Sequence, residues 1–292
     1  MKFAWIEAHA EQWEVAALCE VFEMSTSGYY AWKRRPASGR QQRRTVLLEQ
    51  IRQAHQGSRQ TYGSPRIAAE LKASGVSVCE NTVAKYMRQA GVRSKVNARR
   101  FRVTTTDARH AHPVADNVLD RQFDAAAAAA PDRVWCVDIT YVPTGEGWLY
   151  LAGVLDLYSR KVVGWAMADH LRAELCLDAL AMALEQRRPE PGAGLLHHSD
   201  RGVQYACAAY RAVLDQRGIT CSMSRRGDCY DNAAMESFWG TLKTELVHHE
   251  QYPTRAAARL SIFEYIEVFY NRQRRHSAIG YKSPEAFEAA RT

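Results

Sequence analysis

Residues 134–142 read VWCVDITYV, a run of apolar and β-branched side chains with one acid, Asp138, in its middle. Such a run predicts a strand, and two similar runs, at 148–155 and 161–167, follow after short turn segments. We therefore predict a three-stranded antiparallel meander. A carboxylate inside a buried strand is costly unless a cation or hydrogen-bond donors compensate it, so we expect something cationic beside Asp138.

The segment after the meander predicts helices alternating with a strand. Residues 172–188 carry Leu175 and Leu180 among apolar side chains at helical spacing, 195–198 form a short apolar run, and 208–217 again show a helical pattern. This order predicts an α/β domain in which helices flank a mixed sheet.

Two further acids stand where they could join Asp138. Asp200 directly follows the predicted strand at 195–198, and Glu236 comes after 35 intervening residues, on a stretch with helical spacing. A few hard oxygen ligands favour Mg²⁺ or Mn²⁺. Two such ions, roughly 3.5–4 Å apart, can activate water or a 3′-hydroxyl and neutralise the leaving oxygen in phosphodiester displacement. Taken singly, each acid is also compatible with an ordinary solvated or salt-bridged group.

The positive charge of the chain is concentrated near its start. Of a net charge of +7, residues 1–110 carry 19 Lys and Arg against 9 Asp and Glu, whereas residues 111–292 carry 20 against 23. A basic region favours a polyanionic partner, because neutralised phosphates release their counterions. A basic surface that only confers solubility is the alternative.

A helix-turn-helix pattern lies within this basic region. Short helices are predicted from 11 to about 35 and at 43–55. A helix that begins near Ser64 and ends at Gly75 is followed by a Ser77/Glu80 capping-box pattern and a second helix that ends at Gly91. The second helix has a polar face that could enter a major groove, and basic residues flank the pair. The candidate DNA contacts are Arg66, Asn81, Lys85, Arg88, Arg99 and Arg100. A structural three-helix unit with a solvated face is the alternative.

The remaining segments predict a linker and a C-terminal extension. Residues 101–131 show little core periodicity, apart from a possible helix around Leu119–Ala130. The end of the chain has a helical pattern through Ile262 and Phe269, followed by a basic strip. This strip contains Arg272, Arg274 and Arg275, which read as phosphate contacts or as a solvated helix end. The predicted domains are 1–100, a linker at 101–131, a core at 132–250 and a tail at 251–292 that packs on the core.

The composition excludes a membrane role and zinc is not expected. The seven cysteines form no Cys-x-x-Cys pair, which is typical of reduced thiols in the cytoplasm. No signal peptide opens the chain and no run of 18 apolar residues occurs. His197 and His198 have no second His or Cys pair at matching spacing, so we interpret them as core histidines or as supports for Asp200.

Several strings together resemble one protein family. They are SGYYAWKRR, YGSPRIAAEL, WCVDITYV, GWLYLAGVLDLYSRKVVGW, HHSDRGVQY, SRRGDCYDNAAMESFWGTLKTE and YNRQRRHSAIGYKSPEAF. They resemble the OrfB-type transposases of the third insertion-sequence family, relatives of retroviral integrases, and they cover nearly the whole chain. The resemblance implies a ribonuclease H-like core in which Asp138, Asp200 and Glu236 form the catalytic, two-metal site. It also implies that Lys243, seven residues after Glu236, contacts DNA, although spacing alone allows a solvated lysine.

The function that this resemblance implies is metal-dependent cleavage and strand transfer of insertion-sequence ends. We expect a bacterial, nucleoid-associated protein that binds double-stranded DNA. Because no sustained heptad repeat is present, end pairing is expected to need self-association or a partner from an upstream reading frame. The alternatives are a DNA-binding regulator or inactive remnant without catalysis, and a ribonuclease H-like nuclease that cuts without joining.

Overall fold

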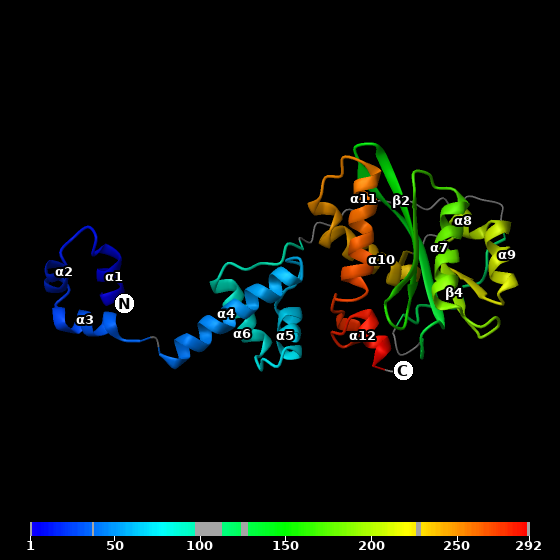
Figure 1. The fold of residues 1–292 in the computed structure, drawn as a ribbon. Coiled ribbons are helices and arrows are strands. Elements are labelled where there is room, and N and C mark those ends of the chain that lie inside the picture. Colours follow the sequence, from blue (N-terminus) through cyan, green and yellow to red (C-terminus); the bar gives the residue numbers. More distant parts are fainter. Residues whose placement is uncertain (1, 37, 97–112, 124–127, 226–228, 291–292) are drawn as a thin grey trace.

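A five-stranded mixed sheet forms the framework of the C-terminal part of the molecule, on the right in Figure 1. The computed structural model describes residues 2–36, 38–96, 113–123, 128–225 and 229–290. The strands follow the order β3-β2-β1-β4-β5. Their bounds are β1 Val134–Thr144, β2 Gly147–Asp156, β3 Val162–Ala168, β4 Leu196–Ser199 and β5 Thr220–Met223.

The first three strands form the predicted antiparallel meander, and β4 and β5 continue the sheet in parallel with β1. The predicted α/β class with a mixed sheet is therefore confirmed. β5 is not among the predicted strands.

Alternation along the strands divides the core into two layers. Trp135 and Val137 of β1 face a cluster that includes α7 (Ala173–Arg187), α8 (Val203–Ala206) and α9 (Ala208–Gln216), whereas Cys136 faces the opposite cluster. Gly164 of β3 lets α7 approach closely, since a Cβ there would lie 2.3 Å from the Ala179 carbonyl oxygen.

The opposite face is covered by the C-terminal helices (Figure 1). These are α10 Ala233–Glu245, α11 Arg255–Phe263, the π-helical turn η3 Glu264–Tyr270 that continues it, and α12 Pro284–Ala289, with short turns η1 Cys229–Asn232, η2 Val247–His249 and η4 Ser277–Ile279. Phe287 of α12 packs against Tyr158.

The helix-turn-helix region joins the same apolar cluster. It consists of α4 Gly39–Gly57, α5 Ser64–Ala73 and α6 Glu80–Gln89. Ile51, Ile67 and Val83 are buried together with side chains of α10 and α11. The two predicted helices are confirmed, but the capping box is wrong, because α6 begins after Cys79 without a side-chain cap.

Three more helices form a separate unit at the far end of the molecule from the sheet (Figure 1). They are α1 Lys2–His9, α2 Val15–Val21 and α3 Thr26–Arg34. Ile6, Leu18, Cys19 and Tyr29 form their own small core. Ser25 caps α3 by accepting a hydrogen bond from the Gly28 N–H.

Residues 113–123 differ from the expected linker. They contain no helix and pack along β5, where the Ser222 hydroxyl accepts hydrogen bonds from the N–H groups of Val118 and Leu119. Leu119 is buried in the core. Among the residues that the structure describes, no helix is both long and apolar enough to cross a membrane.

Candidate active site

Asp138 and Asp200 lie at the same level on two neighbouring strands. The last paired residues of β1 and β4 are Cys136 and His198, and each acid lies two residues further along its strand direction. Both side chains are half-buried. Asp200 follows the carboxyl end of β4, beside Asp138 in the middle of β1, and the carboxyl end of a parallel strand is a common location for a site in an α/β sheet.

Glu236 reaches this region from α10, because a glycine lets the helix approach the sheet. Asp138 pairs with Gly153 of β2, and a Cβ on Gly153 would lie 2.8 Å from the Trp239 ring. Trp239 can therefore lie across the strand, where its Nε1–H donates a hydrogen bond to Asp138 Oδ2 over 3.1 Å. Glu236 lies three residues before Trp239, on an exposed part of the helix.

The three acids are close enough to influence one another electrostatically. Burial raises the pKa of Asp138 well above its ordinary value, and the negative charges of Asp200 and Glu236 raise it further. Two hydrogen bonds oppose this shift, from the Ile139 N–H and from Trp239. Asp200 Oδ1 accepts a hydrogen bond from the Gly202 N–H over 2.9 Å.

The side chains do not form a ready-made ligand set. Within the described part of the chain, no three His, Cys, Asp or Glu side chains lie close enough together to hold a metal ion. The three predicted acids thus lie around the carboxyl end of β4 and the adjoining part of β1, without closing on a common point.

Lys243 lies on the same helix, two turns after Glu236. Its Nζ lies over the ring of Tyr141 of β1, 5.2 Å from the ring centre. Burial lowers the pKa of Lys243, and the charge of Asp138 opposes this shift. The lysine is thus half-buried against β1, near Asp138, rather than a freely solvated side chain.

The two histidines before Asp200 are core residues. His197 Nε2 bonds the Tyr210 hydroxyl over 2.8 Å, and burial lowers its pKa to about 3. His198 Nε2 lies 2.7 Å from the Asp231 carbonyl oxygen, so this nitrogen donates and Nδ1 accepts from the Ser222 hydroxyl. Burial also lowers the pKa of His198, which keeps the ring neutral.

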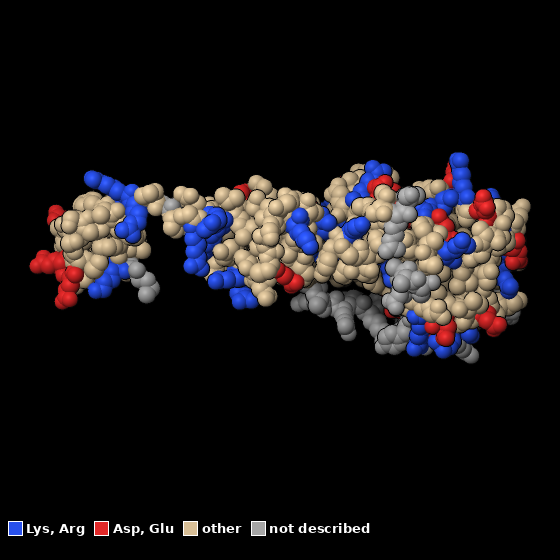
Figure 2. All heavy atoms as spheres, turned by 90° about the horizontal axis from the view of Figure 1, so that it is seen from below, with Lys and Arg blue, Asp and Glu red and all other residues tan. Residues whose placement is uncertain are grey.

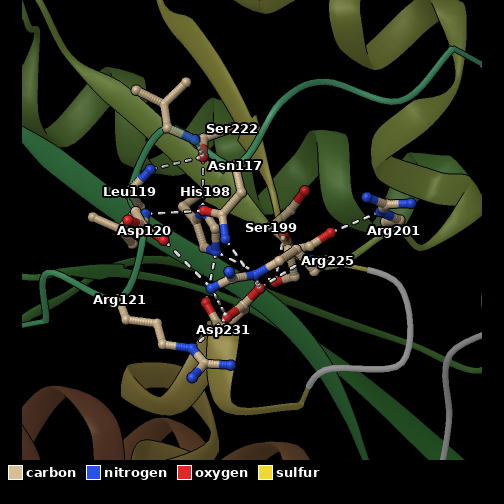
Figure 3. Close-up of polar contacts among 12 residues, drawn as sticks. Asn117, Leu119, Asp120, Arg121, His198, Ser199, Arg201, Ser222, Arg225 and Asp231 are labelled. Atoms are coloured by element: carbon tan, nitrogen blue, oxygen red, sulfur yellow. Dashed lines mark hydrogen bonds and ion pairs between the residues drawn. The ribbon is translucent and has the colours of Figure 1, made fainter.

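Asp231, in the turn η1 before α10, is the centre of a polar cluster (Figure 3). Its side chain is fully buried and accepts hydrogen bonds from Arg225, Arg121 and Asn117. The Arg225 and Arg121 guanidinium groups hold the pKa of Asp231 well below its ordinary value. Asp231 thus joins residues 113–123 to the start of α10. Its position in the sequence indicates only a turn.

Asp156, the last residue of β2, fixes the turn that follows this strand. Its oxygens accept hydrogen bonds from the N–H groups of Asp132 and Ser159 and from the Ser159 hydroxyl. Burial raises the pKa of Asp156 to about 6.

The polar face predicted on α6 is exposed. Asn81, Lys85 and Arg88 face solvent, while Val83 and Met87 are buried on the other side. Arg99 and Arg100 lie outside the described residues.

Exposed arginines on α4 are candidates that the sequence analysis missed. Arg40, Arg43 and Arg44 lie in the first turns of α4, at the i, i+3 and i+4 positions that share a helix face. Figure 2 shows Lys and Arg gathered at the end of the α4–α6 body nearest α1–α3. Their spacing is the signal that could have identified them.

The predicted basic strip at the C-terminus is divided by the fold. Arg274 is 3% exposed, and its guanidinium is held by Glu245, the last residue of α10. Arg275 pairs with Glu70, and Arg66 with Glu245. Arg272 is exposed and lies 3.7 Å from Glu285. We therefore no longer expect phosphate contacts from Arg66, Arg274 and Arg275, because they form ion pairs with Glu245 and Glu70 of the same chain.

Comparisons with known proteins agree with this architecture. Two family models described as "Integrase core domain" match residues 128–229 and 217–284, and one described as "HTH-like domain" matches residues 41–100. The 31 kDa protein of insertion element IS600 from Shigella sonnei is 48% identical over 270 residues, covering 92% of this chain and 97% of that protein. The transposase InsF for insertion sequence IS3A of Escherichia coli K12 is 43% identical over 291 residues, covering 99% and 98%.

Two solved structures are also similar. The catalytic core domain of HTLV-2 integrase, in complex with magnesium, has a TM-score of 0.40 at 15% identity, covering 55% of this chain and 97% of that chain. The intasome of simian T-cell lymphotropic virus has a TM-score of 0.42 at 13% identity, covering 75% and 69%. The relatives in sequence match almost the full length at more than 40% identity. The chain therefore belongs to the IS3 family of transposases, OrfB-type proteins that carry out DNA transposition through an integrase core domain.

Proposed function

We propose that Asp138, Asp200 and Glu236 are the catalytic carboxylates of a polynucleotidyl transferase that cuts the 3′ ends of its element and joins them to target DNA. The observation that carries this proposal is geometric: Asp138 and Asp200 lie at matching positions along neighbouring strands, and Trp239, three residues after Glu236 on α10, donates a hydrogen bond to Asp138. Three carboxylates gathered around the carboxyl end of β4 would be a suitable environment for divalent cations.

The donor set fits Mg²⁺ or Mn²⁺, which prefer a few carboxylate oxygens and keep water and phosphate as further ligands. When bound by these three residues, two such ions would supply the activation of a water or 3′-hydroxyl nucleophile and the neutralisation of the leaving oxygen. The Trp239 N–H and the Gly202 N–H restrict the orientation of Asp138 and Asp200 for this task.

The reaction proceeds in two displacements at phosphorus. In the first, water attacks the phosphodiester at the element end, and the P–O bond to the 3′ oxygen breaks to give a 3′-hydroxyl. In the second, this hydroxyl attacks a target phosphodiester, a new P–O bond forms, and the target strand's own 3′ oxygen leaves. Neither step requires a covalent bond to the protein. Lys243, beside Asp138, would neutralise a nearby phosphate.

The DNA-binding surface that we propose combines the α6 face with basic residues around it. Asn81, Lys85 and Arg88 would contact the major groove, with Arg99, Arg100, Arg272 and the α4 arginines on phosphates. We assign residues 1–100 to DNA binding, 132–250 to catalysis and 251–292 to a tail on the core. We also propose that pairing of two ends needs self-association or the product of an upstream reading frame.

The test is nicking and strand transfer on DNA that carries the element ends, with Mg²⁺ or Mn²⁺. Asp138→Asn, Asp200→Asn and Glu236→Gln should each reduce both products to the level without protein, while Asp169→Asn, a change at an exposed acid near the site in sequence, should leave them unchanged. Full activity of the Asp138 and Glu236 variants would rule the assignment out. Cutting without joining by the wild type would indicate a nuclease.

A further inference from the structure

The last residue of the catalytic helix lies in a dry cluster of charges. Glu245 is 2% exposed, and the Arg274 guanidinium donates two hydrogen bonds to its oxygens over 2.7 and 2.8 Å. The hydroxyl of Tyr265, in η3, donates a third over 2.8 Å. Glu245 is therefore bound to the C-terminal segment through both carboxylate oxygens.

A third cation comes from the helix-turn-helix region. Arg66, in the first turn of α5, places Nη1 3.5 Å from Glu245 Oε1 and stacks over the ring of Tyr62. Tyr62, just before α5, accepts a hydrogen bond from the Arg275 N–H over 2.7 Å. Arg275 in turn bonds Glu70 of α5 over 2.5 Å. Two consecutive arginines of the C-terminal segment thus hold α10 and α5 at the same place.

This cluster completes a continuous connection between two parts of the molecule. The α6 face is exposed on one side, and its buried side packs with Ile67 and Leu71 of α5. From α5 the connection passes through Arg66 to Glu245, and along α10 to Glu236. Glu245 lies nine positions after Glu236, which corresponds to about 13 Å along the helix. Every step is a packed or hydrogen-bonded contact between regular elements.

Stability alone does not account for charges at this junction. A buried ion pair is often no more stabilising than well-packed apolar residues of similar volume, because the desolvation cost offsets the attraction. Such a pair adds directional geometry, because the forked guanidinium donates hydrogen bonds to a carboxylate in only a few orientations. The junction is thus suited to setting the position of one element relative to another.

We propose that Glu245 is a positioning residue that fixes the distance between the DNA-reading helix α6 and the catalytic carboxylate Glu236, and thereby determines which phosphodiester is cut. The inference rests on the proposed function, because it takes α6 as the reading helix and Glu236 as part of the active site. As long as the junction is intact, DNA held by α6 presents one phosphate to the three carboxylates of the active site. When the junction is loosened, neighbouring phosphates also reach the site.

The first experiment maps cut positions at nucleotide resolution on end-labelled DNA. Wild type should cut at one position, and Glu245→Gln should spread the cuts over several adjacent phosphates while total cleavage falls only a few-fold. Arg66→Met leaves the Arg274–Glu245 pair in place and should give the same spread of cuts, so it tests the proposal even where Glu245→Gln folds poorly. Arg66→Lys keeps the positive charge and should cut at the single wild-type position. A merely structural role would lower cleavage without changing its position.

Glu288→Gln is the matched control. Glu288 of α12 forms a largely buried pair with Arg187 of α7, a contact that involves neither α5 nor α10, so its loss should weaken the fold and leave the cut position unchanged. A single cut position in both Glu245→Gln and Arg66→Met would overturn the proposal.

A second measurement needs no catalysis. Donor and acceptor dyes introduced through unnatural amino acids at the exposed positions 85 and 237 report the distance between α6 and α10 in single molecules. The distribution should be narrow in wild type and in Glu288→Gln, and broad in Glu245→Gln and Arg66→Met. An unchanged width in the last two variants would refute the coupling. If the wild type fails to cut DNA, the proposed function fails, and the dye distribution alone decides whether α6 is coupled to α10.

Discussion

The two ends of α10 are held by the same chemistry in different surroundings. Before the helix, the buried Asp231 is bound by Arg121 and Arg225, whose side chains are 46% and 50% exposed. At its end, the buried Glu245 is bound by Arg274, which is 3% exposed. A carboxylate with solvated partners is sensitive to salt, whereas a fully dry pair is screened little by ions. The first end is thus open to modulation by solution conditions, and the second is a fixed joint.

The two joints also connect α10 to different parts of the chain. Asp231 holds residues 113–123 and, through its carbonyl, His198 on β4 (Figure 3). Glu245 holds α5 of the helix-turn-helix region and the C-terminal segment. The helix that carries Glu236 is therefore held by β4 and residues 113–123 at one end and by the helix-turn-helix region and the C-terminal segment at the other.

The largest effect is expected from opening the dry joint. Arg274→Ala leaves Glu245 buried with a charge that is poorly compensated, which should lower the free energy of unfolding by about 3–5 kcal/mol. Urea denaturation at pH 7 measures this loss. Arg272→Ala, two residues earlier and exposed, should cost at most about 0.5 kcal/mol. Equal losses in the two variants would show that burial does not distinguish these arginines.

A smaller loss is expected at the other end, and it should depend on pH. Asp231→Asn keeps the volume but weakens the hydrogen bonds to Arg225 and Arg121, which should cost about 1–3 kcal/mol at pH 7. Because the folded pKa of Asp231 lies below the unfolded one, its contribution is complete above the unfolded value of about 3.9. The contribution is lost as the pH falls through the folded pKa.

Denaturation of wild type and Asp231→Asn between pH 7 and pH 3 checks this dependence. The difference between the two proteins should stay constant down to about pH 5 and shrink below about pH 4. Asp120→Asn, at an exposed acid that also contacts Arg225, is the control and should show little difference at any pH. A difference that grows on acidification would contradict the lowered pKa.

Removal of one neutral donor should have a moderate effect on the dry joint. Tyr265→Phe deletes the hydroxyl that bonds Glu245, which should lower the free energy of unfolding by about 1 kcal/mol. Tyr252→Phe is the control, because its hydroxyl bonds only the partly buried Ser261 at 3.1 Å. If both variants match wild type in urea, the Tyr265 hydroxyl contributes nothing to the joint.

The smallest expected effect is the salt dependence of these losses in stability, which should differ between the two ends of α10. Raising the ionic strength from 0.1 to 1 M shortens the Debye length from about 10 to about 3 Å. The cost of Asp231→Asn should then fall by a few tenths of a kcal/mol, whereas the cost of Arg274→Ala should stay the same. Parallel denaturation series in NaCl test this, and a larger decrease for Arg274→Ala would reverse the comparison.

Local patterns were sufficient for the elements that build the site. The run around Asp138 predicts β1 because alternating buried side chains need no knowledge of distant residues, and the helical spacing around Glu236 predicts α10 in the same way. The exposed face of α6 also follows from its periodicity. The catalytic assignment of the acids came from family resemblance and stays a prediction.

Long-range partners decided what the sequence left open. Arg66 and Glu245 are 179 residues apart, and Arg275 and Glu70 are 205 residues apart, so no local pattern could show that these charges face inward. Residues 113–123 lack a periodic pattern, and the hydrogen bonds that fix their place in the fold go to Ser222 of β5 and to Asp231, about 100 residues further along the chain. Periodicity determines which side chains are buried, but a charge can be assigned to DNA or to the protein itself only once the chain has folded, since its nearest opposite charge is set by the packing of distant elements.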